Sequence, residues 1–291
     1  MYPSRFNYES PKTIEEAIAL LTKGNGEAKI LAGGMSLIPM MKLRFASPEM
    51  LVDINNIPDL NYHRADADGT FHIGALCRHS DLEKSSILAQ HQPTLAATAP
   101  LVADPIVRNR GTFVGSVCHA DPQGDWASAM IALDGMIVAQ GPKGRRTIAV
   151  RDFVTGPFQN VLASNEIAIE AIIPATKGIR FGGYLKLERR IGDFATAGVA
   201  VALELSGASV IRAGIGLTGV GSSTVNATDA AQSLVGSPLT SEAIERAADL
   251  AAQAAQPRSD HRGSAAYKKQ VVRTFVVRIL TEINSTKTKA A

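Results

Sequence analysis

Two short segments of the sequence combine glycine with hydroxyl-bearing residues in a pattern that suits phosphate. The first is AGGMS, residues 32–36, which follows an apolar run, and the second is NRGTFVGSVCHADPQGD, residues 109–125. In such segments consecutive backbone N–H groups can face outward and bind phosphate oxygens, and glycine lets the ligand approach without meeting a Cβ atom. The hydroxyl groups of Ser36, Thr112 and Ser116 could donate further hydrogen bonds.

Asp125, at the end of the second segment, has the opposite preference. A carboxylate repels phosphate but accepts hydrogen bonds from sugar hydroxyl groups. Two phosphate-suited segments and one hydroxyl acceptor therefore favour a dinucleotide whose two halves run in opposite directions. Either segment taken alone is more typical of a plain turn, so the prediction depends on the pair.

A third glycine segment, GIGLTG at residues 214–219, matches the dinucleotide fingerprint G-x-G-x-x-G letter for letter. That fingerprint requires a helix directly after the glycines and an acidic residue about 20 positions further on. The residues that follow, VGSSTVNATDAAQSL, predict no immediate helix, and Asp229 comes too early. We therefore interpret this segment as part of a glycine-rich strand and not as a nucleotide site.

The surrounding patterns predict the elements that position the first two segments. A short helix is expected after Thr13, which can cap it together with Glu16 three residues later. A strand before the first glycine segment, an apolar helical turn after it and the strand MLVDI then form a β–α–β unit. The segment GTFVGSVCHA, residues 111–120, is expected to be a loop punctuated by glycine.

The second part of the chain has a different pattern. Strands are expected at 184–189, 195–205 and 209–220, with the turn LSGAS indicating an antiparallel hairpin. Two alanine-rich helices are expected at about 241–256 and 264–283. The sequence thus predicts an α+β fold with a boundary after Pro174.

Composition excludes several classes of function. The chain has 291 residues, with 30 basic and 27 acidic side chains, so its balance of charge gives no case for nucleic acid or an anionic membrane. Its two cysteines, Cys77 and Cys118, cannot hold an iron–sulfur cluster, which needs about four, and no His or Cys spacing indicates a metal site. No run approaches the ~18 apolar residues of a membrane span, and we expect a cytoplasmic protein.

Three segments carry a resemblance to a known family. Residues 29–54, KILAGGMSLIPMMKLRFASPEMLVDI, resemble the first flavin-binding motif of the FAD-carrying medium subunit of molybdenum hydroxylases, the carbon monoxide dehydrogenase and xanthine dehydrogenase family. Residues 106–130, IVRNRGTFVGSVCHADPQGDWASAM, resemble the second motif. Residues 184–203, YLKLERRIGDFATAGVAVAL, are similar to the segment that opens the family's C-terminal domain. The three motifs occur in order, and the resemblance covers nearly the whole chain.

The resemblance implies a division of the chain. An FAD-binding domain of the p-cresol methylhydroxylase/vanillyl-alcohol oxidase type would span residues 1–176, with subdomains of about 1–57 and 58–176. A C-terminal α+β domain, with a three-stranded antiparallel sheet and helices, would span residues 177–291.

The resemblance also implies which residues bind FAD. The family's first pyrophosphate loop corresponds to Lys29, Ile30, Leu31, Ala32, Gly33, Gly34, Met35 and Ser36. Its second corresponds to Thr112, Val114, Gly115 and Ser116, and its cleft lining to Ala103, Val107 and Gly111. Asp125 would hold ribityl or ribose hydroxyls, Lys186 would lie near the pyrimidine end of the ring, and the surroundings of the ring would include Ile167, Ala168 and Phe194.

One residue departs from the family pattern. The family usually has two adjacent glycines in the second loop, where this chain has Val114 before Gly115. A β-branched residue would be strained there if the position needed a positive φ. Either the loop accepts valine with a negative φ, which we favour, or FAD affinity is reduced.

The resemblance implies an oxidoreductase complex with two partners. These are an iron–sulfur small subunit carrying 2Fe-2S clusters and a molybdopterin large subunit, assembled as a dimer of heterotrimers. The large subunit would oxidise the substrate and the clusters would pass electrons to FAD, so we assign no catalytic residue to this chain. One alternative is a self-sufficient flavin oxidase or reductase of the same superfamily, which should turn over a small substrate alone. Another is a flavin-free assembly module, for which Val114 is the only hint.

Overall fold

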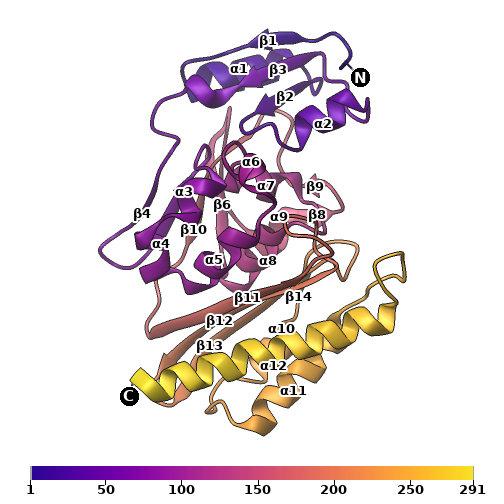
Figure 1. Cartoon of the computed structure of the whole chain (residues 1–291). Helices are drawn as coiled ribbons and strands as arrows, with labels where there is room; N and C mark the ends of the chain where they lie inside the picture. The colour runs from indigo at the N-terminus through magenta and orange to yellow at the C-terminus, as the bar shows by residue number, and fades with distance from the viewer. Residues whose placement is uncertain (1, 291) are drawn as a thin grey trace.

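The computed structural model describes residues 2–290, with side chains described as far as residue 286, and its sheets follow one another along the molecule (Figure 1). The first is a parallel sheet of order β1-β3-β2. Its strands and helices are β1 (Asn7–Glu9), α1 (Ile14–Lys23), β2 (Ala28–Leu31), α2 (Leu37–Lys42) and β3 (Met50–Asp53). The expected β–α–β unit is confirmed, and so is the cap of α1, where the side chain of Thr13 accepts a hydrogen bond from Glu16 N.

The second sheet is antiparallel, with the strand order β4-β5-β10-β6-β7. Its strands are β4 (His63–Ala65), β5 (Phe71–Gly74), β6 (Met136–Gly141), β7 (Gly144–Ala149) and β10 (Ile167–Ile173). The short segments around it are η1 (Ile54–Asn56), α3 (His79–Glu83), α4 (Ser86–His91), α5 (Pro93–Thr98), η2 (Ala99–Leu101), α6 (Pro105–Arg108), α7 (Phe113–His119), α8 (Asp125–Ala132), α9 (Val150–Phe153), β8 (Val154–Gly156) and β9 (Gln159–Asn160).

Helix α7 corrects the sequence analysis, which expected a loop at 111–120. Thr112 caps the helix, because its Oγ1 accepts a hydrogen bond from Gly115 N at 3.3 Å. Phe113, Val114 and Val117 are buried in the central hydrophobic core, and this packing stabilises a helix that the local sequence favours weakly.

The third sheet is also antiparallel, with the order β11-β12-β13-β14. The three expected strands are present, and a two-residue fourth strand extends the sheet. The elements of this part are β11 (Ile179–Leu187), β12 (Ala197–Ser206), β13 (Ser209–Thr218), β14 (Val225–Asn226), α10 (Thr228–Gln232), α11 (Ser241–Ala254) and α12 (Ala265–Ala290).

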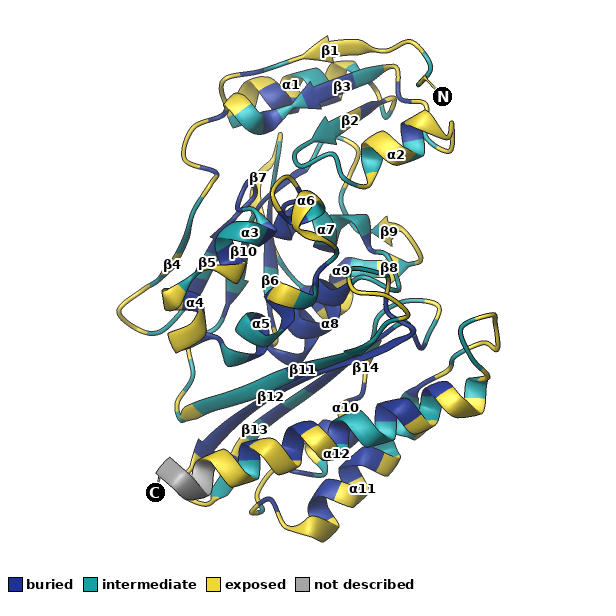
Figure 2. Ribbon diagram, viewed as in Figure 1, coloured by how far each residue is buried: buried dark blue, intermediate teal, exposed yellow. Residues whose placement is uncertain are grey.

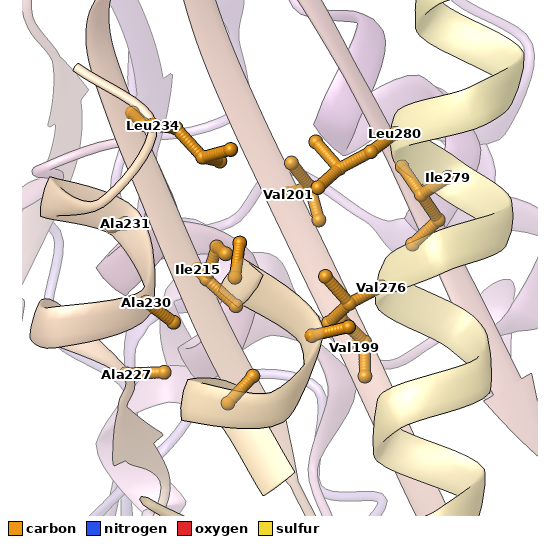
Figure 3. Close-up of a cluster of buried hydrophobic side chains, with 14 of the residues drawn as sticks. Val199, Val201, Ile215, Ala227, Ala230, Ala231, Leu234, Val276, Ile279 and Leu280 are labelled. Atoms are coloured by element: carbon orange, nitrogen blue, oxygen red, sulfur yellow. The ribbon is translucent and has the colours of Figure 1, made fainter. Parts of the chain in front are cut away.

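Strand β12 is buried along its length from Ala197 to Leu205, because both faces of its sheet are covered (Figure 2). On one face lie α5 and α8, and on the other lie α10, α11 and α12. Figure 3 shows Val199 and Val201 of β12 directed toward Val276 and Leu280 of α12. A strand covered on both faces needs apolar residues at successive positions, which explains the near-continuous run AGVAVALEL.

The glycines of the fingerprint-like segment 214–219 lie in and just after strand β13, as expected. A Cβ atom at Gly214 would lie 1.9 Å from Ala132 O, and one at Gly216 would lie 2.0 Å from Ser128 O. Both oxygens belong to α8. These glycines therefore let α8 pack closely on the third sheet, and this is their role in the fold.

Candidate cofactor site

The two glycine segments predicted to bind phosphate lie against each other. A Cβ atom at Gly33 would lie 2.4 Å from Arg110 O and 2.7 Å from the Cα atom of Gly111. It would also lie 3.0 Å from Thr112 N. Backbone oxygen, Cα and nitrogen atoms cannot rotate away, so only glycine allows this approach. The fold thus places residues 32–36 beside residues 110–112.

The first segment turns sharply between β2 and α2. Gly34 has φ +75°, a conformation that favours glycine. Ser36 stands at the N-cap of α2, but its hydroxyl makes no capping hydrogen bond and the residue is exposed. Its hydroxyl therefore remains available to a ligand. Lys29 in β2 is also exposed.

The second segment is the cap and first turns of α7. Gly111 is also constrained, because a Cβ atom there would lie 2.7 Å from Nε2 of His79. Val114 lies within α7, is 2% exposed, and is absent from the residues with positive φ. The strain that a positive φ would impose on Val114 therefore does not arise, as we favoured. Gly115 and Ser116 follow it on the helix and are only partly buried.

Asn55 and Arg78 join the two segments, and neither was predicted from the sequence. Asn55 Nδ2 donates a hydrogen bond to Ala32 O at 2.8 Å. Arg78 donates one hydrogen bond to Asn55 Oδ1 and another to Arg110 O. These partners lie 23 and 32 residues apart in the sequence, so no local spacing could have indicated them.

Asp125 and Lys186, both predicted site residues, meet in a buried polar network. The Lys186 ammonium lies 3.2 Å from Asp125 Oδ2 and 3.3 Å from Glu188 Oε2, and it donates to Leu101 O at 2.8 Å. Tyr184 OH donates to Asp125 Oδ1 at 2.6 Å. Burial raises the pKa of Asp125, while Lys186 and the Tyr184 hydroxyl oppose that shift. With three oxygens around its ammonium, Lys186 orients Asp125 and the backbone at Leu101.

The segment after Leu101 is held by a buried arginine. Arg108 donates to Val102 O at 3.1 Å and to Ala103 O at 2.9 Å, and it pairs with Glu83 at 2.8 Å. Ala103 has φ +48°, an uncommon backbone conformation for a residue with a Cβ atom. Of the predicted cleft residues, Ala103 thus lies just before the short helix α6 and Val107 lies within it. This helix leads into the second glycine segment.

The last three predicted residues lie further from the glycines: Ala168 shares a hydrophobic cluster with Phe113, Val114 and Val117 of the second segment, and Ile30 and Ala32 of the first loop pack against the cluster that contains Ile167. Ile167 and Ala168 are buried within β10, in two different hydrophobic clusters. Phe194 is 53% exposed on the loop between β11 and β12, and its carbonyl accepts a hydrogen bond from Arg262. Gly192 on the same loop lies against Ala103, so this loop borders the expected cleft. Contact of these three residues with a flavin ring stays a prediction.

The residues present fit a dinucleotide. Glycines allow the close approach at Gly33 and Gly111, and the two segments that could hold phosphate meet at one place. Arg78 and Arg110 add positive charge there, which phosphate oxygens favour.

Within the part of the chain described, residues 2–290, no helix is both long enough and apolar enough to cross a bilayer.

Two family models match the chain. The model described as the FAD binding domain in molybdopterin dehydrogenase matches residues 4–176, and the one described as the CO dehydrogenase flavoprotein C-terminal domain matches residues 183–283. The carbon monoxide dehydrogenase medium chain of Hydrogenophaga pseudoflava is 42% identical over 280 residues, which are 96% of this chain and 97% of that one. The xanthine dehydrogenase FAD-binding subunit of Escherichia coli O157:H7 is 26% identical, with 95% of each chain covered.

The fold is also similar to solved structures. A chain of carbon monoxide dehydrogenase from Hydrogenophaga pseudoflava, lacking the Mo-pyranopterin moiety of the molybdenum cofactor, superposes with a TM-score of 0.92 and 43% identity, covering 97% of this chain and 98% of that chain. A chain of reconstituted CO dehydrogenase from Oligotropha carboxidovorans superposes with a TM-score of 0.93 and 38% identity, covering 98% of this chain and 99% of that chain.

Proposed function

This chain belongs to the family of FAD-binding medium subunits of molybdenum hydroxylases, and from that premise we propose that it transfers electrons through a bound FAD. The electrons would come from 2Fe-2S clusters of an iron–sulfur small subunit. A molybdopterin large subunit would oxidise the substrate, and an external acceptor would take the electrons from FAD. We further propose a dimer of heterotrimers in the cytoplasm, with the FAD domain ending near residue 176.

One observation carries the proposal: Gly33 packs on the backbone of Arg110–Thr112, so the two loops lie side by side, where they would form one site. The backbone of residues 32–36 and the first turns of α7 would hold the pyrophosphate. Asp125, already oriented by Tyr184 and Lys186, would face the ribityl or ribose hydroxyls. Bound FAD would supply the redox chemistry, since a flavin accepts single electrons and releases two together. The chain's own part is to bind and orient it.

The test is the absorption spectrum after incubation with FAD and desalting. It is measured both on the chain alone and on the complex purified through a tag on this chain. We expect flavin bands near one equivalent in the complex, together with iron and molybdenum on the copurified subunits. The variant Gly33→Ala should hold little flavin, because its Cβ atom would collide with the second loop, whereas Gly156→Ala, whose nearest neighbour is a flexible glutamine, should bind normally. A complex without flavin would contradict the proposal.

The same preparations test the alternatives. A self-sufficient oxidase or reductase would reduce its flavin with a small substrate when the chain is alone. A flavin-free assembly module would copurify with the partner subunits while holding no FAD.

A further inference from the structure

We propose that Arg78 is a positioning residue that clamps the two pyrophosphate loops together through Asn55. The inference rests on the proposed function, because it concerns how the same site is kept in shape to receive FAD. It adds two residues that the family resemblance does not point to, and it assigns them a joint role.

The clamp is a continuous series of hydrogen bonds. It begins at Arg110 O, which accepts from Nη1 of Arg78. The Nη2 atom of the same guanidinium donates to Asn55 Oδ1, and Asn55 Nδ2 donates to Ala32 O at 2.8 Å. One end lies in the second loop and the other in the first. Two side chains therefore link the loop that follows β2 of the first sheet to the loop between α6 and α7.

The backbone of Arg78 is itself fixed to the second loop. Arg78 and Thr112 form an antiparallel β-bridge, in which His79 N donates to Gly111 O at 3.1 Å and Phe113 N donates to Cys77 O at 3.0 Å. Only the guanidinium thus has to reach toward the first loop. Asn55 is held as well, because its backbone N–H donates to Asp53 Oδ1 at 2.9 Å at the start of η1. The backbones of both linking residues, Arg78 and Asn55, are therefore held by hydrogen bonds.

The chemistry of the link requires arginine. A guanidinium presents N–H groups in a planar fork and can donate to two acceptors in fixed directions. A lysine ammonium at the end of a flexible chain supplies the same charge but not that fork. A substitution by lysine therefore separates the geometric role of Arg78 from its charge.

The charge of Arg78 is also suited to the place. Burial and the nearby Arg110 lower the pKa of Arg78, while Asp81 and Asp53 act in the opposite direction. Two guanidinium groups that disfavour each other's charge are stabilised by an anion near them, and phosphate is the anion that the loops are proposed to hold.

The experiment compares Arg78→Gln, Arg78→Lys and Asn55→Ala with a matched control, Arg64→Gln. Arg64 of β4 is an arginine that pairs with Asp66 and lies over the Tyr62 ring, and its described contacts include neither loop. FAD affinity is measured by titration of the flavin-stripped complex, and thermal unfolding without FAD shows that each variant folds. We expect FAD affinity to fall about 10- to 100-fold in all three test variants and to stay unchanged in the control. The double variant Asn55→Ala/Arg78→Gln should bind no worse than Arg78→Gln, since either change cuts the same link.

A second readout does not depend on FAD. Hydrogen–deuterium exchange of the flavin-free protein should be faster at residues 32–36 and 110–113 in both Arg78 variants, and unchanged in Arg64→Gln. If Arg78→Lys matches the wild type in affinity and exchange while Arg78→Gln does not, charge alone matters and the clamp is overturned. Unchanged behaviour in Arg78→Gln would overturn it too. A wild-type complex that takes up no FAD would refute the proposed function, and the exchange measurement would still decide whether the clamp exists.

Discussion

Replacing Lys186 by methionine should be one of the most destabilising single changes in this protein. The Lys186 side chain is 1% exposed, and its ammonium lies within 3.3 Å of the carboxylates of both Asp125 and Glu188. These two carboxylate side chains are only 7% and 16% exposed. Methionine fills a similar volume but leaves two nearby carboxylates without their cation.

The size of the effect follows from this burial. Removing one partner of a buried ion pair costs about 3–5 kcal/mol, because the remaining charge is neither hydrated nor paired. The loss of the hydrogen bond to Leu101 O adds to that cost. With a denaturant dependence of about 3 kcal/mol per molar urea, the unfolding midpoint should fall by about 1 M or more.

The cost should also depend on pH, and the sign can be worked out. Burial already raises the pKa of Asp125 above its usual value, and Lys186 opposes that rise. Without Lys186, the pKa in the folded protein rises further, so the folded state binds a proton at a pH where the unfolded chain has lost it. Stability then falls as pH rises through that window, by about 1.4 kcal/mol per pH unit. The cost of Lys186→Met should therefore be largest at pH 8 and smaller at pH 5.

The assay is urea unfolding of the wild type and Lys186→Met at both pH values, followed by intrinsic tryptophan fluorescence. The double variant Asp125→Asn/Lys186→Met serves as a control, because an amide cannot ionise and most of the pH dependence should vanish. A cost below about 1 kcal/mol, or an equal cost at pH 5 and pH 8, would refute the reasoning that Lys186 stabilises a buried carboxylate.

Three further predictions follow from contacts described above. Gly216→Ala should destabilise the fold by about 3 kcal/mol in urea unfolding, since its Cβ atom would lie 2.0 Å from Ser128 O, whereas Gly156→Ala should cost far less. Val114→Gly should destabilise by about 2–3 kcal/mol and bring no gain in an FAD titration, because the residue is 2% exposed inside a helix. Burial lowers the pKa of His79 to about 4. Between pH 6.5 and 4 the unfolded chain therefore binds a proton at this histidine while the folded protein does not, so the free energy of unfolding is at its full value above pH 6.5 and falls as pH decreases toward 4. His79→Gln should accordingly show a shallower loss of stability over that range, and an unchanged slope would contradict this assignment.

Local patterns predicted the elements whose signals are complete within a few residues. The cap of α1 needs only Thr13 and Glu16: Thr13 accepts a hydrogen bond from Glu16 N as expected, while the Glu16 carboxylate accepts from Lys12 N, one residue before the cap. Helix α7 was mistaken for a loop because glycine, valine and threonine favour helices weakly. What makes it helical is tertiary: Phe113 and Val117 are buried against residues far away in the chain. That packing cannot be predicted from the residues of the helix alone.

The candidate site likewise has one part that could be predicted from the local sequence and one part that depends on tertiary structure. The two glycine loops could be predicted because each is a continuous segment. The Asn55–Arg78 link could not, since an asparagine after a strand and an arginine before a short helix are each ordinary. They acquire a role in the site only in the folded protein, where Ala32 O and Arg110 O lie within hydrogen-bond distance of the same pair of side chains.

The glycine segments also show that a glycine motif alone does not distinguish close packing within the protein from a site for an anion. At Gly216 the missing Cβ atom makes room for Ser128 O of a packed helix, and at Gly33 it makes room for the backbone of Arg110 and Gly111. In both cases glycine permits close approach of protein to protein. The difference lies in what that approach creates: at Gly216 it buries a sheet beneath a helix, whereas at Gly33 it joins two loops beside Arg78 and Arg110. A glycine motif therefore predicts close packing, and it becomes a prediction of anion binding only when the packed segments also gather positive charge.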